Sequence, residues 1–195
     1  TKYMEDKLSD KLHEELMKSF VDKRISILSR SLKQDIALGT EIKNDNDVII
    51  SAGAGMTMLV NKFQRILGMK IHERYKDQIK ITNRPIVFVT HMEHHSNQTT
   101  WIETVADVKL IPHSKDGKLD LGSFKDMLES FSDREIKIAA VTSCSNVTGV
   151  FTPYYEIAEM MHLVNGYCFV DFACSAPYIN IDMHPAKESQ ALDAI

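Results

Sequence analysis

The sequence has few cysteines, no excess of basic residues and no apolar run of the roughly 20 residues that a membrane-spanning helix needs. With 23 basic and 27 acidic residues, the net charge is −4. A surface for nucleic acid or an anionic membrane would need clustered Lys and Arg in excess, so neither partner is expected. The three cysteines fit a reducing cytoplasm better than a disulfide framework. They are Cys144, Cys168 and Cys174.

What the chain does contain is typical of a globular protein: 44% hydrophobic and 26% charged residues in a length of 195, which is enough for one domain with a core. We therefore expect a single domain over residues 1–195. The first residue is Thr1 rather than Met, and residues 191–195 resemble the approach to a buried strand. We expect the chain to be a fragment of a longer protein, incomplete at both ends.

The first segment has the pattern of a long amphipathic helix, at about residues 3–38. Apolar side chains recur at every fourth position, beginning with Met4, Leu8 and Leu12, and charged residues fill the other face. From about residue 48 to residue 195 the pattern is different and indicates the core of the domain.

In this core, short apolar runs alternate with helical patterns. Strands are predicted at 48–50, 85–89, 108–111, 136–141 and 167–170, and helices at 56–67, 121–131 and 153–164. Continuously apolar strands that alternate with helices indicate a mostly parallel sheet with helices on both faces. The sequence thus predicts an α/β fold of three layers.

Four of the predicted strands are followed by clusters of glycine or polar residues. The clusters lie at residues 53–57 (Gly-Ala-Gly-Met-Thr), 91–97 (His-Met-Glu-His-His-Ser-Asn), 143–146 (Ser-Cys-Ser-Asn) and 171–174 (Asp-Phe-Ala-Cys). In a parallel sheet all four would meet at the carboxyl edge, where open α/β sheets bind their ligands. The coincidence of four clusters predicts a binding site at that edge.

The glycine-bearing cluster has the features of a phosphate site. Exposed N–H groups and the positive end of the following helix favour an anion, and Thr57 could add a hydroxyl. The segment is not a P-loop, because no Gly-Lys-Ser/Thr follows, and Met58 replaces the third glycine of a dinucleotide fingerprint. A tight turn that merely needs glycine is the alternative interpretation.

The histidine-rich cluster allows three interpretations. His91, Glu93, His94 and His95 are potential zinc ligands, so a zinc-dependent hydrolase is one hypothesis. Their spacing matches neither His-Glu-x-x-His nor His-x-x-Glu-His. The histidines could instead cap the next helix, or an imidazole could stack on a flat cofactor ring.

Asp171 ends an apolar strand, where an unpaired carboxylate would be costly to bury. It could cap a helix or form a salt bridge, or it could hold a protonated heterocyclic nitrogen and keep both groups charged. Asn146 could donate to a phenolate-like oxygen or cap a turn.

Together these residues resemble the class V aminotransferase superfamily, the pyridoxal-phosphate (PLP) enzymes of fold type I, and within it the cysteine desulfurase and selenocysteine lyase branch. The similarity lies in the family's phosphate turn, its Glu-His-His-x-Asn-x-x-Pro-Trp, its Ser-Asn-x-x-Gly and its Val-Asp-x-Ala-Gln-x-x-Pro. The matching segments occur in the family's order, at residues 55–57 with Asn61, 93–97 with Trp101, 145–149 and 170–177.

The resemblance implies an enzyme that uses pyridoxal 5′-phosphate to act on an amino acid, as a transferase or lyase, and that forms a homodimer. His94 would stack on the pyridine ring and assist proton transfer, which makes it the predicted catalytic residue. Asn146 would bind the phenolic oxygen. Asp171 would bind the ring nitrogen, whose proton lets the ring accept electrons from a bond broken at the substrate α-carbon. The phosphate would be held by Gly55, Met56 and Thr57.

The chain departs from the family pattern at three places. Cys174 takes the place of a glutamine among the cofactor-binding residues, and a thiol is a poor donor to the phenolic oxygen. Thr100 replaces a proline, so another branch fits about as well as the desulfurases. The lysine that forms the Schiff base belongs to a Ser-x-His-Lys motif that these 195 residues do not contain, and Lys187 lacks that context. We expect the chain alone to be inactive. A noncatalytic domain that retains the fold is a further alternative.

Overall fold

The computed structural model describes residues 51–195. The helix predicted at about residues 3–38 and the strand predicted at 48–50 lie outside the described residues. The prediction of a single domain over residues 1–195 stays a prediction.

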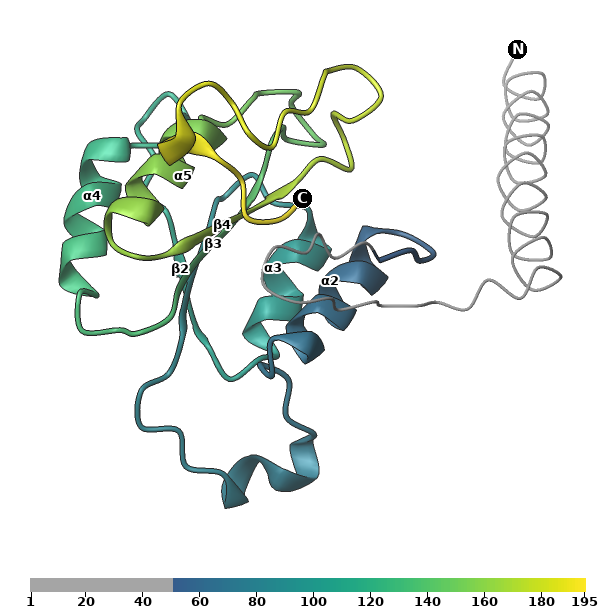
Figure 1. Cartoon of the computed structure of the whole chain (residues 1–195), viewed down its shortest axis with the longest axis vertical. Helices are drawn as coiled ribbons and strands as arrows, with labels where there is room; N and C mark the ends of the chain where they lie inside the picture. The colour runs from purple at the N-terminus through teal and green to yellow at the C-terminus, as the bar shows by residue number, and fades with distance from the viewer. Residues whose placement is uncertain (1–50) are drawn as a thin grey trace, which may run out of the picture. The chain divides into compact units, whose positions relative to one another are not determined.

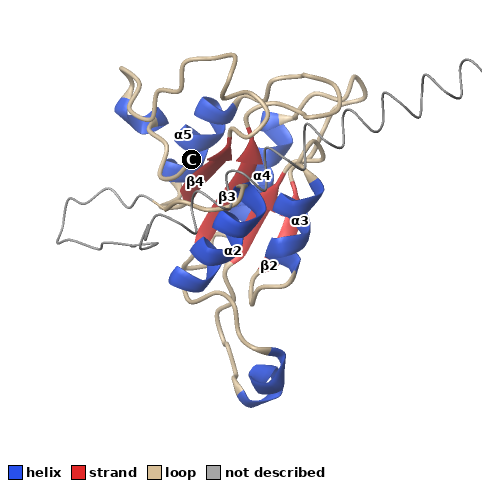
Figure 2. Ribbon diagram, turned by 90° about the vertical axis from the view of Figure 1, so that its right-hand side faces the viewer, coloured by secondary structure: helices blue, strands red, loops and turns tan. Residues whose placement is uncertain are grey.

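Four strands form one parallel sheet (Figure 2). They lie in the order β2-β1-β3-β4, and every neighbouring pair is parallel. The predicted parallel sheet is therefore confirmed, and the bounds of each strand lie within one residue of the predicted ones. The strands are β1 (Ile86–Val89), β2 (Asp107–Leu110), β3 (Lys137–Thr142) and β4 (Tyr167–Asp171).

Helices cover both faces of the sheet and complete the three layers (Figure 1). One face carries α2 (Met56–Ile66) and α3 (His95–Ile102), and the other carries α4 (Leu121–Ser130) and α5 (Tyr154–Leu163). The helices α2, α4 and α5 match the predicted ones to within one residue at each end. The helix α3 and two short 3₁₀ helices, Glu73–Gln78 and Glu188–Gln190, were not predicted.

Side chains of each inner strand alternate between two apolar cores. In β1, Ile86 and Phe88 face the core with α4 and α5, whereas Val87 and Val89 face the core with α2 and α3. All four side chains are completely buried. Since both faces are covered, the strand is apolar at every position, as expected for a parallel strand.

Local sequence signals explain where two of the helices begin and end. The Asp120 carboxylate accepts a hydrogen bond from the Ser123 N–H at 3.0 Å and caps the start of α4. The helix α5 starts directly after Pro153, which suits the first turn of a helix. It ends before Asn165, whose φ of 55° lies in the left-handed region that Asn tolerates better than most residues.

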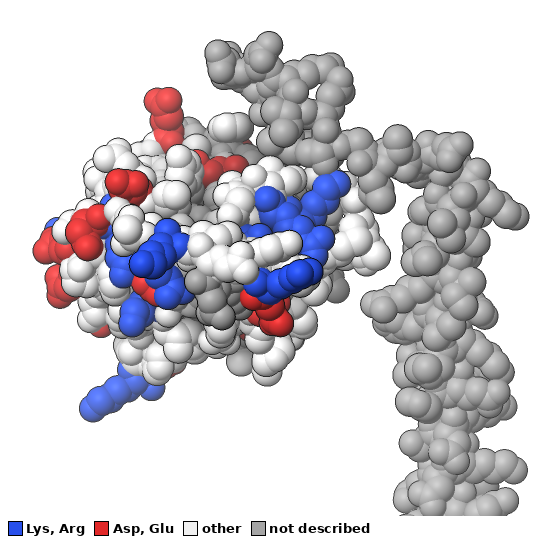
Figure 3. Space-filling view, turned by 90° about the horizontal axis from the view of Figure 1, so that it is seen from below, with Lys and Arg blue, Asp and Glu red and all other residues white. Residues whose placement is uncertain are grey.

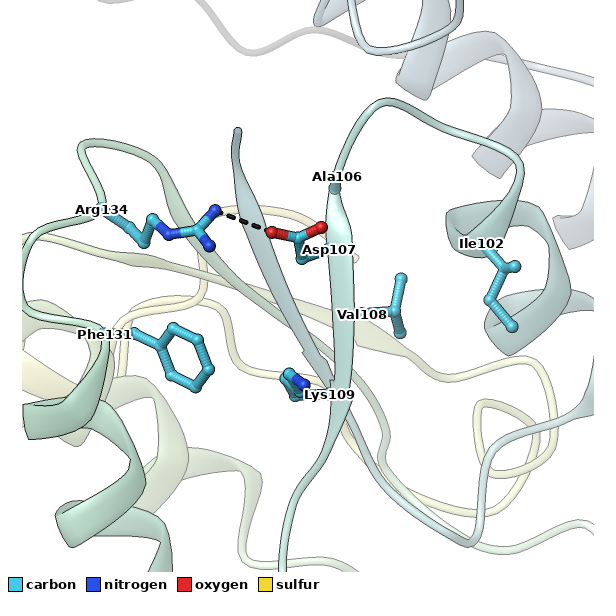
Figure 4. A pocket seen from close by; sticks show the side chains of 7 residues that line it. All are labelled: Ile102, Ala106, Asp107, Val108, Lys109, Phe131 and Arg134. Carbon is cyan, nitrogen blue, oxygen red and sulfur yellow. Dashed lines mark ion pairs between the residues drawn. The ribbon is translucent and has the colours of Figure 1, made fainter. Parts of the chain in front are cut away.

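Charged side chains lie along the edge strand β2. Asp107 pairs with Arg134 at 2.8 Å and with Arg84 at 3.4 Å, and Lys109 lies beside Phe131 (Figure 4). Asp107, Lys109, Phe131 and Arg134 are among the residues that line a pocket of about 480 Å³ along the strand. Charged residues on an edge discourage another strand from pairing with it, and this accounts for the polar character of the pocket.

On the face of the molecule seen in Figure 3, basic and acidic side chains lie near one another rather than in separate fields. Two ion pairs on the surface are Lys70–Glu103 at 3.2 Å and Lys118–Asp116 at 3.9 Å. Within residues 51–195, no helix combines the length and the apolar character that crossing a bilayer requires.

Residues near the C-terminus extend the pairing of the sheet. Ala194 forms a parallel bridge with Phe169, and the Val170 N–H donates to the Ala194 carbonyl at 2.9 Å. The Asp193 carboxylate accepts the Cys168 N–H at 2.7 Å and lies 3.0 Å from His162 Nε2. The pairing agrees with the buried strand that the sequence predicts to start at residues 194–195.

Candidate functional site

The carboxyl edge of the sheet brings three of the four predicted clusters together. Residues 91–97 follow β1, residues 143–146 follow β3, and Asp171 is the last residue of β4. Neighbouring parallel strands end at the same edge, and the pairing Thr142↔Asp171 places the ends of β3 and β4 side by side. The fourth cluster, residues 53–57, leads into α2 on the adjacent face.

Two backbone donors at the N-terminus of α2 have no partner among residues 51–195. Gly55 has a φ of 150°, which favours glycine, and no side chain of the described residues caps the helix. The N–H groups of Met58 and Leu59 bond to the Gly55 carbonyl. Those of Met56 and Thr57 donate to nothing within residues 51–195, and the first turn contains no acidic residue. Such a helix end suits an anion.

His94 is the N-cap of α3. Its Nδ1 accepts the Ser96 N–H at 3.2 Å and lies 2.7 Å from Ser96 Oγ. The capping interpretation of this histidine is therefore confirmed. The ring is exposed, and with Nδ1 as acceptor its Nε2 makes no hydrogen bond to residues 51–195. Capping and ring stacking are thus compatible at His94.

Asp171 is buried, with 5% of its surface exposed, yet only one of its two oxygens is used. Oδ1 accepts the Ala173 N–H at 2.8 Å, and Oδ2 accepts no hydrogen bond from the described residues. Burial raises the pKa of the Asp171 carboxyl, while the Ala173 N–H and the nearby charge of His94 act in the opposite direction. A cationic partner at Oδ2 would offset the cost of this burial.

The loop after β3 presents Asn146 to solvent. Ser145 Oγ accepts the N–H groups of Val147 and Thr148, both at 3.3 Å, so the backbone forms a tight turn around Ser145. Gly149, with a φ of 71°, completes the turn. The Asn146 side chain is exposed and makes no hydrogen bond to the described residues, so its amide can bind a ligand.

Cys174 is half-buried beside the Cys144 thiol, a contact that the sequence did not predict. The Ser143 and Ser175 hydroxyls lie 2.5 Å apart, which places the two segments in contact. Burial, and then the neighbouring Cys174, raise the pKa of the Cys144 thiol. All three cysteines are free.

The histidine cluster does not form a metal centre in the described part of the chain. His91 lies beside His113, with ring centroids 4.6 Å apart, while His94 caps α3 and His95 is exposed on its first turn. Among residues 51–195, no three His, Cys, Asp or Glu side chains are placed to hold a metal ion together.

Glu93 has a structural role that the sequence did not reveal. Its Oε1 accepts the Thr90 hydroxyl at 2.6 Å and the Thr142 N–H at 2.8 Å, and its Oε2 accepts the Asn97 amide at 2.7 Å. Asn97 Oδ1 in turn accepts the Trp101 indole N–H at 3.1 Å. Burial raises the pKa of Glu93, although these hydrogen bonds act against the shift. Glu93 thus joins the ends of β1 and β3 to α3, directly beside His94.

Comparison with known proteins identifies the family. A family model described as "Aminotransferase class-V" matches residues 70–187, which is more than half of the chain. The chain therefore belongs to the class-V aminotransferase family.

Several similar proteins are cysteine desulfurases by name. That of Haloferax volcanii is 37% identical over 101 residues, covering 50% of this chain and 23% of the relative. That of Cronobacter sakazakii is 34% identical over 111 residues, covering 55% and 25%. A NifS-like protein from Rickettsia africae has a TM-score of 0.49 at 22% identity, over 56% of this chain and 29% of that one. The chain spans about a quarter of the length of these curated relatives.

Proposed function

We propose that the chain binds PLP at the carboxyl edge of the sheet and is the cofactor-binding part of an enzyme that acts on an amino acid, as a transferase or lyase. The observation that carries this proposal is a complementary set of groups that residues 51–195 leave unpaired, three at the carboxyl edge and one at the start of α2. It consists of an uncapped helix end, an exposed imidazole, a free amide and a buried carboxylate with one open oxygen.

Each group suits a different part of PLP. The N–H groups of Met56 and Thr57, together with the glycine at position 55, would hold the phosphate. The exposed ring of His94 would stack on the pyridine ring. Asn146 would donate to the phenolic oxygen, and Asp171 Oδ2 would accept the proton of the ring nitrogen.

The chemistry of such a site depends on keeping that proton in place. When bound, the cofactor would supply a protonated pyridine ring that accepts electrons from a bond broken at the substrate α-carbon. Asp171, buried and charged only at a cost, would hold the proton at the ring nitrogen, because the ion pair would offset the burial of both charges. His94 Nε2 would serve to move a proton beside the cofactor.

The 195 residues contain no Ser-x-His-Lys, and Lys187 is paired with Glu159 on the surface. We therefore propose that this chain by itself binds PLP without a covalent anchor and has no turnover. Cys174 would pack beside the phenolic oxygen without the strong donation that an amide gives.

The same proposal extends to assembly, substrate and location. The substrate class is an amino acid, as the names of the cysteine desulfurase relatives suggest. A homodimer is supported by exposed apolar side chains on the loops after β3 and β4, among them Val147 at 85% and Tyr178 at 84% exposure. Three free cysteines suit the cytoplasm.

The test is equilibrium dialysis of the chain against PLP, with Asp171→Ala and His94→Ala as variants. Asp126→Ala, which changes an exposed carboxylate on α4, is the matched control. We expect saturable binding of one PLP, weakened at least about tenfold in Asp171→Ala by loss of a charged hydrogen bond. In His94→Ala, loss of ring stacking should weaken it about 2- to 10-fold. Binding that is absent, or unaffected by either variant, would contradict the proposal.

A further inference from the structure

Two helices with different tasks in the proposed site are joined by one buried hydrogen bond. Gln64 Nε2 on α2 donates to Thr100 Oγ1 on α3 at 3.1 Å. Gln64 is completely buried and Thr100 is 6% exposed. The two helices lie side by side on the same face of the sheet (Figure 1).

The hydrogen bond belongs to a chain of contacts that reaches His94. Thr100 Oγ1 also donates to the Ser96 carbonyl at 2.8 Å. Ser96 in turn contacts His94 Nδ1 through both its N–H and its hydroxyl. A change at Thr100 is therefore transmitted within α3 to the imidazole that caps it.

On the α2 side, the bond holds the helix whose first turn carries the free N–H groups of Met56 and Thr57. Gln64 and Val60 are the buried residues of α2, one turn apart on one face. Val60 makes only apolar contacts, which let a helix slide along its neighbour. The directional hydrogen bond at Gln64 opposes such sliding from within the core, and Lys70, which contacts Asn61 and Glu103, adds a link at the surface.

Gln64 is an unusual choice for a purely structural position. Its Oε1 is buried and accepts no hydrogen bond from the described residues. A buried acceptor without a partner destabilises the fold, so an apolar side chain of similar size would suit the packing at least as well. The amide has to be explained by something other than the stability of the fold.

We infer that the Gln64–Thr100 hydrogen bond sets the spacing between the phosphate turn of α2 and the ring-stacking His94 of α3. The inference rests on the proposed function. Phosphate and ring are covalently linked in the ligand, so both can bind at full strength only when the two helix ends are held at the matching distance. Gln64 and Thr100 are positioning residues and touch no ligand atom.

The experiment compares the binding of three ligands to chains with and without the Gln64–Thr100 hydrogen bond. Pyridoxine 5′-phosphate carries ring and phosphate and forms no covalent bond with lysine, whereas pyridoxine and inorganic phosphate carry one part each. Binding of each is measured by calorimetry for the native chain, Gln64→Leu, Thr100→Val and the double variant. Thr100→Ser, which keeps the hydroxyl, is the rescue. Asp126→Asn, which neutralises an exposed carboxylate on α4 away from both helices, is the control.

The inference predicts that each variant lacking the hydrogen bond binds pyridoxine 5′-phosphate about 3- to 10-fold more weakly, the range for one lost hydrogen bond. Affinities for inorganic phosphate and for pyridoxine stay within about twofold, because each part of the site is intact. Thr100→Ser and Asp126→Asn bind as the native chain does. The double variant, with both partners apolar, unfolds at no lower urea concentration than the native chain.

Two results would overturn the inference while leaving the proposed function intact. One is native affinity for pyridoxine 5′-phosphate in the double variant. The other is a parallel loss of affinity for all three ligands, which indicates a general scaffold role. If the native chain itself binds no pyridoxine 5′-phosphate, the proposed function fails instead.

Discussion

The backbone N–H of Thr142 donates to Glu93 Oε1 at 2.8 Å and so connects the end of β3 with the first turn after β1. The two residues are 49 positions apart in the sequence. Through this bond the carboxylate fixes the edge from which His94 and Asn146 extend. A buried structural carboxylate thus joins the two segments that carry predicted ligand-binding residues.

Replacing Glu93 by Ala leaves buried donors of Thr90, Thr142 and Asn97 without their acceptor. We expect the free energy of unfolding in urea to fall by at least about 2 kcal/mol. Glu129→Ala removes an exposed carboxylate from α4 and should change it by less than about 0.5 kcal/mol. Equal stability of the two variants would show that the Glu93 network contributes nothing.

Asp171→Asn is expected to separate stability from ligand binding. Burial raises the folded-state pKa of Asp171 above its ordinary value of 3.8. The ionised carboxylate therefore lowers the free energy of unfolding at pH values above the raised pKa. This destabilisation is absent below about pH 3.8, where the carboxyl is protonated in both states. The neutral amide keeps an acceptor for Ala173 and removes this cost. The variant should therefore be more stable than the native chain in urea at pH 7, by a margin that shrinks toward pH 3.5, and should bind PLP more weakly. Lower stability at pH 7 would refute the account, with Asp126→Asn as the control.

Cysteine reactivity should follow burial. Cys174 is partly exposed, whereas burial raises the pKa of the Cys144 and Cys168 thiols, which lowers their thiolate fraction at neutral pH. Iodoacetamide at pH 7.5, followed by peptide mass spectrometry, should label Cys174 first. In urea all three should react at similar rates. Labelling of Cys168 as fast as Cys174 in the native chain would contradict the buried position of β4.

The contact between His162 and Asp193 should make stability depend on pH. Burial alone would lower the pKa of His162, but hydrogen bonds to the Asp193 carboxylate and the Ser189 carbonyl outweigh it and raise the pKa above 6.5. A raised histidine pKa gives stability that is complete below pH 6.5 and lost as the pH rises through the folded-state value.

His162→Gln should therefore cost more stability in urea at pH 6 than at pH 9. His184→Gln, at an exposed position, should show no such difference. If His162→Gln lowers the free energy of unfolding equally at both pH values, His162 does not retain its proton beside Asp193.

The parts of the fold that sequence could predict are those with a periodic apolar pattern. Strands such as β1 are apolar at every position because both faces are covered, and this signal is local. The helix α3 was missed because six of its eight residues, His-Ser-Asn-Gln-Thr-Thr, are polar. It is held by the His94 cap and by the contact of Asn97 with Trp101, neither of which gives a periodic pattern.

In the candidate site, too, some residues could be predicted from local sequence and others depend on tertiary contacts. Asp171 was found because a carboxylate at the end of an apolar strand is conspicuous in sequence. The role of Glu93 and the contact of Cys144 with Cys174 depend on the register between strands, here Thr142↔Asp171, which the sequence does not reveal. The sequence grouped Glu93 with possible metal ligands for that reason.

Hydrogen–deuterium exchange with and without saturating PLP tests most directly whether the four separate segments form one PLP site. Protection is expected at the same time in residues 55–59, 91–97, 143–149 and 171–175, because each contributes a ligand contact or a backbone donor. Exchange in α4 should be unchanged. Protection confined to one of the four segments, or found only elsewhere in residues 51–195, would contradict the account.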